Sequence, residues 1–330
     1  MKILRVGDPH ITVSNVIDGQ RLITFILKIA KEREVDAIEF LGDLFHTHAV
    51  KRLEVEYFWR ISFQEIKTLL NIPVIVLVGN HDMPGSKEKE QQMNALDVFN
   101  GINNVVVVNR PAILNGIAYI PYMSDKEAFI NEAKALHKEG AIELLVAHQT
   151  FTGATYDNGF YAEDGIDPAL VPQTNIISGH IHTSQEVGKC FYPGTSKWDS
   201  VTDANKEKGI WIYDHNKDGS VKNKELIPTK GVVTSINKYI VEEGELEPEI
   251  ISSDMYRNYI ELKGKTPWIA KMKKKYKGLA KIKATPTDRR VASEDNKSTT
   301  IYDHLEKKFI PIDGVSKVDI KKYLKENTIL

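Results

Sequence analysis

The 330-residue sequence contains a single cysteine, Cys190, which excludes a small secreted scaffold built on disulfide bonds. No uncharged apolar run reaches the roughly 18 residues that a membrane helix needs. With 21 glycines, 13 prolines and 8% aromatic residues, the chain is neither collagen-like nor broadly disordered. The amino terminus, MKILRVGDPH, has its first acid too early for a signal peptide. We therefore expect a globular cytoplasmic protein in which Cys190 is a small buried hydrophobe.

The net charge of −1 gives no indication of a nucleic-acid partner, but the charges are unevenly distributed. Residues 231–330 carry 20 basic and 15 acidic side chains, whereas residues 1–230 carry 24 and 30. Such an asymmetry can separate a metal site from a contact with a polyanion. The length suggests roughly two domains at about 150 residues each.

The first 150 residues alternate between two hydrophobic patterns. Short runs rich in Val and Ile predict buried strands, and longer segments between several of them have helical periodicity. Because this alternation is typical of helices that cover a sheet, we predict an α/β fold. The predicted strands are 2–6, 37–41, 74–78, 105–108 and 144–147, and the predicted helices are 19–33, 53–70 and 126–138.

The second half of the chain predicts fewer helices. Residues 153–172 are rich in Gly, Asp, Asn and Pro and indicate a loop. Strand-like runs follow at 175–178, 190–192 and 209–213, and a domain boundary is expected near 228–231. Beyond it, 232–241 and 258–262 predict strands, and 270–276 leads into a lysine-rich segment.

Polar clusters follow the predicted strands. Four of them begin with glycine: GDPH at 7–10, GDLFH at 42–46, GNHD at 79–82 and GHIH at 179–182. In a fifth place, His148 ends a strand. The crevice beyond the carboxyl ends of strands is the usual ligand site of open α/β sheets, so we expect the clusters to converge on one edge. A glycine before each cluster lets the chain turn sharply.

The clusters supply candidate ligands for two metal ions. Carboxylate, imidazole and carboxamide groups suit manganese, iron, zinc or magnesium better than a thiolate-binding metal. Asp43 is the natural bridging ligand, because a carboxylate has two oxygens to share. Two ions together activate water and clamp an in-line displacement at phosphorus. The seven candidates are Asp8, His10, Asp43, Asn80, His148, His180 and His182.

Two further histidines would lie beside the ions without binding them. His81 and His46 are placed to stabilise a phosphoryl oxygen or to protonate a leaving oxygen. One histidine at a strand end is more often an ordinary surface or core residue, but seven candidate ligands at successive strand ends favour a metal centre. His48 has no spacing argument and is interpreted as a surface residue.

The series GDPH, GDLFH, GNHD, VAHQ and GHIH resembles the calcineurin-type metallophosphoesterase superfamily over about residues 1–215. Within it, GDLFH with His46 resembles the SbcD family of DNA double-strand-break-repair nucleases. Protein serine/threonine phosphatases usually carry Asp-Arg-Gly in the second motif, which is absent here. The segment YPGT at 192–195 also resembles the family, although Thr195 is often serine there.

The resemblance implies a two-sheet metallophosphoesterase sandwich flanked by helices over 1–230. It also implies a smaller α+β cap domain that binds DNA over 231–295, and a C-terminal helical segment over 296–330 that binds an ATPase partner. The implied cofactors are two divalent metal ions, with manganese favoured and magnesium as an alternative, and there is no ATP site in this chain. One metal would be held by Asp8, His10 and His182 and the other by Asn80, His148 and His180, with Asp43 bridging and with His81 and His46 catalytic.

The activity implied by the resemblance is manganese-dependent cleavage of DNA. Such enzymes act as 3′→5′ exonucleases on duplex ends and as endonucleases on single strands, in DNA repair and recombination, with an SbcC-type coiled-coil ATPase. Two alternatives stay open. One is a small-molecule phosphodiesterase or phosphatase on the same scaffold, without a preference for DNA. The other is a non-catalytic DNA-end-binding subunit, which has no physical need for seven polar ligands.

The last hundred residues support weaker predictions. A contact with DNA phosphates and a solvated surface are both open interpretations of the basic segment. The tail 301–330 has two amphipathic parts that would dock on the chain's own cap or bind the ATPase. The resemblance also implies a homodimer, for which the helix predicted at 53–70 offers either an interface or ordinary core packing. The basic segment contains seven lysines and no acid: Lys271, Lys273, Lys274, Lys275, Lys277, Lys281 and Lys283.

Overall fold

The computed structural model describes residues 1–85, 93–216 and 219–288. The ATPase-binding segment predicted over 296–330 and the last residues of the predicted cap lie outside the described residues. None of the described helices is long and apolar enough to cross a membrane.

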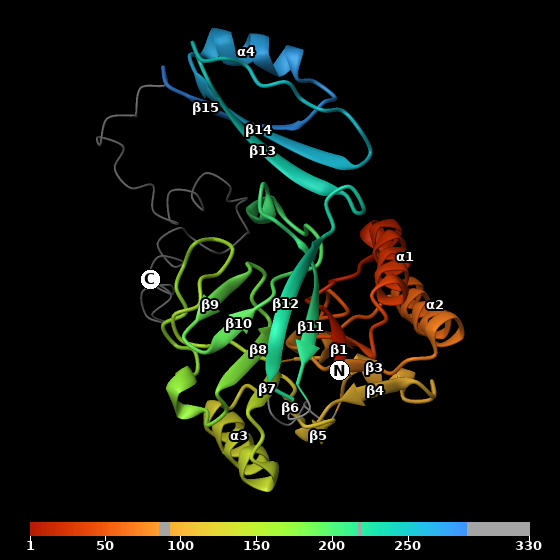
Figure 1. Cartoon of the computed structure of the whole chain (residues 1–330). Coiled ribbons are helices and arrows are strands. Elements are labelled where there is room, and N and C mark those ends of the chain that lie inside the picture. Colours follow the sequence, from red (N-terminus) through yellow and green to blue (C-terminus); the bar gives the residue numbers. More distant parts are fainter. Residues whose placement is uncertain (86–92, 217–218, 289–330) are drawn as a thin grey trace, which may run out of the picture.

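Two six-stranded sheets stand at the centre of the molecule (Figure 1). The first has the order β12-β11-β1-β2-β3-β4, with β1 to β4 parallel. The second has the order β5-β6-β7-β8-β10-β9, with β6, β7, β8 and β10 parallel. The first sheet comprises β1 (Lys2–Val6), β2 (Ala37–Phe40), β3 (Val74–Leu77), β4 (Val105–Val108), β11 (Gly209–His215) and β12 (Val221–Pro228). The second comprises β5 (Ala112–Leu114), β6 (Ile117–Ile120), β7 (Leu144–His148), β8 (Asn175–Gly179), β9 (Gln185–Val187) and β10 (Cys190–Tyr192).

The central strands form because both of their faces are covered. All four residues of β3, VIVL, are buried. Ile3 and Leu77 of the first sheet share one core cluster with Tyr119 and Ile177 of the second. Continuous apolar runs, rather than alternating ones, are expected for parallel strands buried on both sides. Cys190 is also buried, as predicted.

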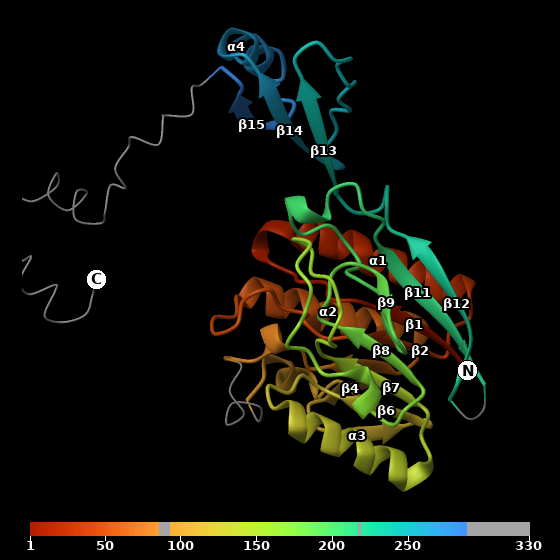
Figure 2. The same ribbon diagram turned by 90° about the vertical axis from the view of Figure 1, so that its left-hand side faces the viewer.

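Helices cover the outer faces of this sandwich (Figure 2). α1 (Val16–Glu32) and α2 (Leu53–Leu70) pack on the first sheet, and α3 (Lys126–Gly140) packs on the second. α1 begins before the predicted start at Gly19. Gly19 lies in its first turn, and a larger residue would not fit there, because a Cβ would come within 2.9 Å of the Phe58 ring of α2. The predicted α/β sandwich flanked by helices is confirmed.

A third, three-stranded sheet stands beyond the end of the sandwich, with one helix on its far side (Figures 1 and 2). Its strands β13 (Ser235–Glu242), β14 (Tyr256–Gly264) and β15 (Lys281–Pro286) are parallel. α4 (Thr266–Lys275) covers it through Ile269 and Met272, which share a core cluster with Leu262. These elements follow the boundary expected near 228–231, and the domain limits themselves stay a prediction.

Asp18 of α1 joins the third sheet to the sandwich. Its carboxylate accepts hydrogen bonds from the backbone N–H of Thr234 at 3.0 Å and from the Thr234 hydroxyl at 2.7 Å. Arg257 of β14 also reaches this carboxylate, at 3.4 Å. Ile236 of β13 belongs to the same apolar cluster as α1 and α2. The smaller sheet is therefore held against one end of the sandwich.

Candidate metal centre

Seven polar side chains meet at the edge where the carboxyl ends of the parallel strands come together. β1, β2 and β3 lead to this edge from the first sheet, and β7 and β8 lead to it from the second. Turns that are far apart in the sequence therefore open into one crevice. The structure brings together all seven predicted ligands: Asp8, His10, Asp43, Asn80, His148, His180 and His182.

One group of donors surrounds His148. Its Nε2 lies 3.3 Å from Asp43 Oδ2 and 3.1 Å from Asn80 Oδ1. Asn80 Oδ1 lies in turn 2.8 Å from His180 Nδ1. The ligand atoms of Asp43, His148 and His180 all lie within 4.8 Å of one another. Imidazole, carboxylate and carboxamide donors around one point fit a divalent ion.

A second group lies on the other side of Asp43. His10 Nε2 is 3.0 Å from His182 Nε2 and 3.6 Å from Asp43 Oδ2. The Asp43 carboxylate thus stands between the two groups, as a bridging ligand must.

Asp8 adjoins the first group in these contacts. Its Oδ2 accepts the backbone N–H of His180 at 2.8 Å, and its Oδ1 lies 3.7 Å from His148 Nδ1. Asp8 Oδ1 is buried and has no hydrogen-bond partner among the described residues, which fits a ligand atom awaiting a cation. The assignment of Asp8 to the metal held by His10 and His182 stays a prediction.

The backbone at four of the candidate ligands is strained. Asp8, His10, Asp43 and His180 have φ angles of +31°, +43°, +52° and +78°. Positive φ is uncommon for residues other than glycine and concentrates at functional sites, where surrounding contacts hold the strain. The strained backbone conformations therefore coincide with residues whose side chains belong to the candidate metal centre.

The glycines before the ligands have two different roles. Gly42 has a φ of +106°, so it provides the sharp turn that the sequence predicts. Gly79 has no such turn. A Cβ on Gly79 would lie 2.2 Å from Asp43 Oδ1, so its role is to let two clusters approach closely.

Three histidines flank the ligand groups. The ring of His81 is 4.8 Å from that of His10, and its backbone N–H donates to Asp43 Oδ1 at 2.8 Å. His46 lies 5.3 Å from His10, centroid to centroid, with a side chain that is 52% exposed. His48 is half-buried: it stacks on His81 at 4.1 Å, and its Nδ1 lies 2.9 Å from the carbonyl oxygen of Asn80. The surface interpretation of His48 is therefore wrong, because the second cluster folds back over the third.

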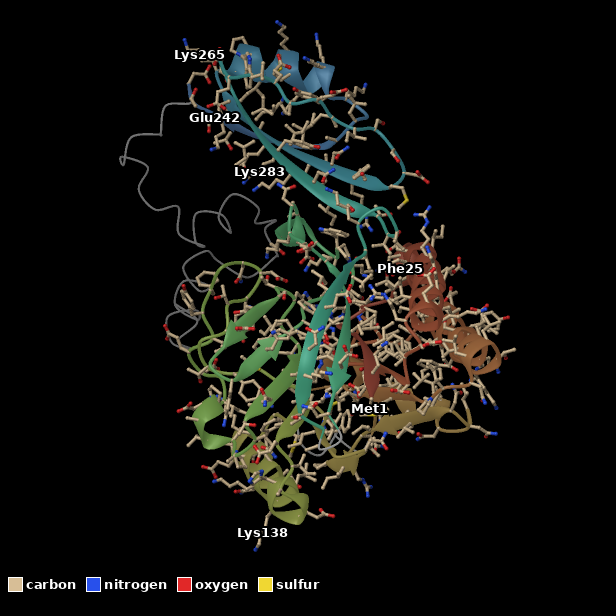
Figure 3. The ribbon with its side chains drawn as sticks, in the orientation of Figure 1. Met1, Phe25, Lys138, Glu242, Lys265 and Lys283 are labelled. Carbon is tan, nitrogen blue, oxygen red and sulfur yellow. The ribbon has the colours of Figure 1, made fainter. Side chains whose placement is uncertain are left out.

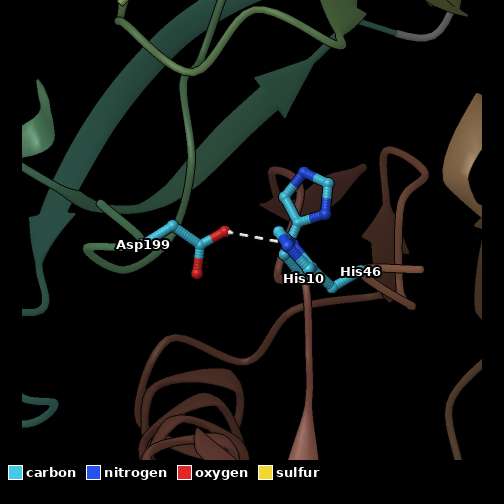
Figure 4. Close-up of side chains that lie close together, drawn as sticks. All are labelled: His10, His46 and Asp199. Carbon is cyan, nitrogen blue, oxygen red and sulfur yellow. Dashed lines mark ion pairs between the residues drawn. The ribbon is translucent and has the colours of Figure 1, made fainter. Parts of the chain in front are cut away.

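Sequence reasoning missed two aspartates at the site. Asp157 Oδ2 lies 3.1 Å from His182 Nδ1, and its other oxygen accepts the Thr183 hydroxyl at 2.8 Å. Asp199 Oδ2 lies 4.0 Å from His46 Nδ1, and Asp199 forms a possible ligand group with His10 and His46 (Figure 4). Both aspartates come from loops, and the only signal in the sequence is that each lies near a recognised motif.

Burial and charge set the protonation of the cluster. Burial alone would raise the pKa of Asp43, but His148 and His10 hold it well below its usual range. Burial alone would lower the pKa of His148, but Asp43 raises it to about 9. Burial lowers the pKa of His10 far below its usual value and that of His180 to about 3, so both offer lone pairs at neutral pH. This charge pattern fits a divalent cation, which would replace the proton of His148.

The seven lysines predicted to bind DNA do not form one surface. Lys271, Lys273, Lys274 and Lys275 are exposed on α4, and Lys277 is exposed just after it. Lys281 and Lys283 lie on β15, whose alternate residues Ile282 and Ala284 pack toward the α4 core. These two lysines therefore lie on the opposite face, toward the sandwich, where Figure 3 labels Lys283.

The family model of the calcineurin-like phosphoesterases matches residues 1–184, which is more than half of the chain. The chain therefore belongs to this family, whose members are metal-dependent hydrolases of phosphate esters. The candidate ligands follow the strands of the matched region, up to His182 after β8.

Three relatives illustrate the similarity. Putative phosphoesterase 078R of Invertebrate iridescent virus 3 is 30% identical over 209 residues, 59% of this chain and 57% of that protein. Putative phosphoesterase 244L of Invertebrate iridescent virus 6 is 28% identical over 208 residues, 59% of this chain and 69% of that protein. The DNA double-strand break repair protein Mre11 of Sulfolobus acidocaldarius is 24% identical over 253 residues, 72% of this chain and 63% of that protein. The match thus spans less than two thirds of the first and the third relative.

Proposed function

We propose that this phosphoesterase is a manganese-dependent DNA nuclease of the SbcD type. It would act as a 3′→5′ exonuclease on duplex ends and as an endonuclease on single strands, in the processing of DNA breaks. The observation that carries the proposal is that the crevice with the candidate ligands leads to a lysine-bearing face of the third sheet. The similarity to a DNA double-strand break repair protein over 72% of this chain supports it further.

The path from the crevice to the lysines can be followed through contacts. A cleft of about 360 Å³ is lined by His180, His182 and Thr202. Three residues after Thr202, Asn205 exchanges two hydrogen bonds with the backbone of Lys238 on β13.

Lys238 shares one face of the third sheet with Lys283. Both ammonium groups lie 3.4 Å from the carboxylate of Glu261 on β14. Lys281, on the same face, lies over the Tyr259 ring at 5.9 Å. A phosphate backbone that enters the cleft would pass these cations, and such contacts bind DNA without regard to sequence.

The residues of the chain have distinct roles in the proposed reaction. When bound, two divalent ions would polarise the phosphodiester and activate water for attack at phosphorus. His81 Nδ1 lies 2.5 Å from the carbonyl oxygen of His46, so this nitrogen donates its proton there and Nε2 carries the lone pair of the neutral ring. Nε2 is then the atom that would exchange a proton with a substrate oxygen. Asp199 would orient His46 beside it.

The proposal includes two partners. A homodimer is proposed from the resemblance, and Leu53 and Tyr57, which are exposed one turn apart on α2, offer an apolar contact for it. An SbcC-type coiled-coil ATPase is proposed from the motif resemblance alone, and the segment expected to bind it lies outside the described residues.

The proposal is tested by cleavage of end-labelled duplex DNA with Mn²⁺ or with EDTA. We expect loss of the label with Mn²⁺, none with EDTA, and none in a His81→Ala variant. His137→Ala is the matched control, because His137 lies at the end of α3, where its ring contacts the carbonyl oxygen of Ile142. No cleavage, with hydrolysis of bis-p-nitrophenyl phosphate intact, would favour a small-molecule phosphoesterase. DNA binding that survives EDTA without any cleavage would favour an end-binding subunit.

A further inference from the structure

A second cavity lies at the same edge of the sandwich, beside the ligand groups. It has a volume of about 190 Å³ and is formed where β3, β4 and β6 end. Its lining includes Val78 and Met83, which are both buried, together with Pro111 and Pro121. Most of the residues that line the cavity are thus apolar.

The cavity and the metal centre share a wall. The short turn Asn80–Asp82 separates Val78 from Met83, so one side of this segment faces the cavity while Asn80 belongs to the ligand groups. Tyr122 is the second shared element. Its backbone N–H donates to the carbonyl oxygen of Val78 at 2.9 Å, and its half-buried ring lies 5.8 Å from the His180 ring, centroid to centroid. A molecule in the cavity would contact Tyr122 one side chain away from the metal centre.

The rim of the cavity carries one cation. Arg110 follows β4, is exposed, and has no carboxylate within ion-pair distance in the described parts of the chain. The neighbouring Asn109, by contrast, is engaged by a hydrogen bond to Asp97 at 3.0 Å. A cavity lined by apolar residues and one tyrosine, with a guanidinium at its rim, suits a flat ring that is linked to an anion.

We propose that this cavity binds one nucleobase of the strand being cleaved. The base stacks on Tyr122, and Arg110 contacts a phosphate adjacent to the scissile one. Stacking on an aromatic side chain accepts every base, so the subsite selects nucleotides over other phosphate esters without reading a sequence. The inference rests on the proposed nuclease function and adds to it a substrate class for this cavity: nucleotide phosphodiesters.

The test is a comparison of two ligands that differ only in the base. Isothermal titration calorimetry with the Mn²⁺-loaded chain compares deoxyadenosine 5′-monophosphate with 2-deoxyribose 5-phosphate. We expect the nucleotide to bind about 10-fold more tightly or better, since one stacked base contributes that much. Tyr122→Ala should reduce this ratio to near one, whereas Tyr122→Phe, which keeps the ring, should preserve it. Arg110→Ala should weaken the binding of a dinucleotide more than that of the mononucleotide, and Arg110→Lys should restore part of the loss.

Two results would overturn the inference: equal affinities of the wild-type chain for both ligands, or a ratio that Tyr122→Ala leaves unchanged. The nuclease proposal is judged separately, by the DNA cleavage assay. Cleavage of DNA together with equal affinities would refute the subsite and keep the nuclease. A preserved base preference without DNA cleavage would keep the subsite and direct attention to smaller nucleotide substrates.

Discussion

Replacing Arg5 by methionine tests how much the buried ion pair between β1 and β2 contributes to stability. Arg5 of β1 and Glu39 of β2 are fully buried, with Arg5 Nε 2.6 Å from Glu39 Oε2. Arg5 Nη1 also lies 2.8 Å from His215 Nε2, and the Tyr119 hydroxyl donates to the other oxygen of Glu39. In Arg5→Met the Glu39 carboxylate stays out of water and keeps Tyr119 as its one hydrogen-bond partner among the described residues.

The expected loss follows from that unpaired charge. Removing one partner of a buried ion pair costs about 3–5 kcal/mol. Arg5→Met combined with Glu39→Gln removes the charge and keeps an acceptor for Tyr119, so the loss should shrink to about 1–2 kcal/mol. Arg33 is the matched control. It binds Glu225 through two nitrogens at 2.7 and 3.2 Å, but both side chains are nearly half exposed, and Arg33→Met should cost under about 1 kcal/mol.

The assay is the free energy of unfolding from urea titrations of the four proteins. The reasoning predicts that the double variant is more stable than Arg5→Met. It is refuted if the double variant is the less stable of the two, or if Arg5→Met costs no more than Arg33→Met.

Three further predictions concern the metal centre and the buried histidine. Asp157→Asn should weaken Mn²⁺ binding about 10- to 100-fold in calorimetry, because His182 loses its orienting carboxylate. The control Asp164→Asn, in the same loop, should bind Mn²⁺ as the wild-type chain does. If Asp157→Asn also binds Mn²⁺ with the wild-type affinity, Asp157 is not part of the site. Gly79→Ala should lower the rate of phosphodiester hydrolysis by roughly 100-fold, because its Cβ displaces Asp43. In the control Gly101→Ala the new Cβ meets nothing within 4 Å, so the rate should stay unchanged. Burial and Arg5 lower the pKa of His215 to about 4. The unfolded chain, with a histidine pKa near 6.5, therefore takes up a proton before the folded chain does as the pH falls. About 2–3 kcal/mol of the free energy of unfolding should be lost between pH 6.5 and pH 4. His215→Gln should remove that part of the pH dependence of unfolding, and a variant with the same dependence would contradict the assignment.

The candidate ligands could be predicted from the sequence because they depend on topology more than on contacts. Each predicted ligand follows or ends a strand with a clear apolar run, and parallel strands send their carboxyl ends to a common edge. Asp8 and His180 are 172 residues apart, yet the side chain of the first binds the backbone of the second. The predicted limits of helix 53–70 match α2 for a different, local reason: the apolar residues of this segment repeat with a helical period.

The residues that sequence reasoning missed depend on how loops fold over the site. Asp157 lies in a loop whose composition indicates only irregular structure, and His48 becomes part of the site by stacking on His81. The lysine-rich segment has no acid to interrupt it, but a turn between α4 and β15 places Lys275 and Lys283 on opposite faces of the sheet. Local pattern identifies such side chains but does not determine which of them meet.

The most direct test of the account is the number of metal ions that the chain binds. Equilibrium dialysis against Mn²⁺, with the bound metal counted by mass spectrometry, should give two ions per chain for the wild-type protein. His148→Ala should bind no more than one, because it removes the donor at the centre of the first group and leaves His10 and His182 in place. One ion or none in the wild-type chain, at Mn²⁺ concentrations that saturate its hydrolytic activity, would contradict the two-metal centre on which the proposed function rests.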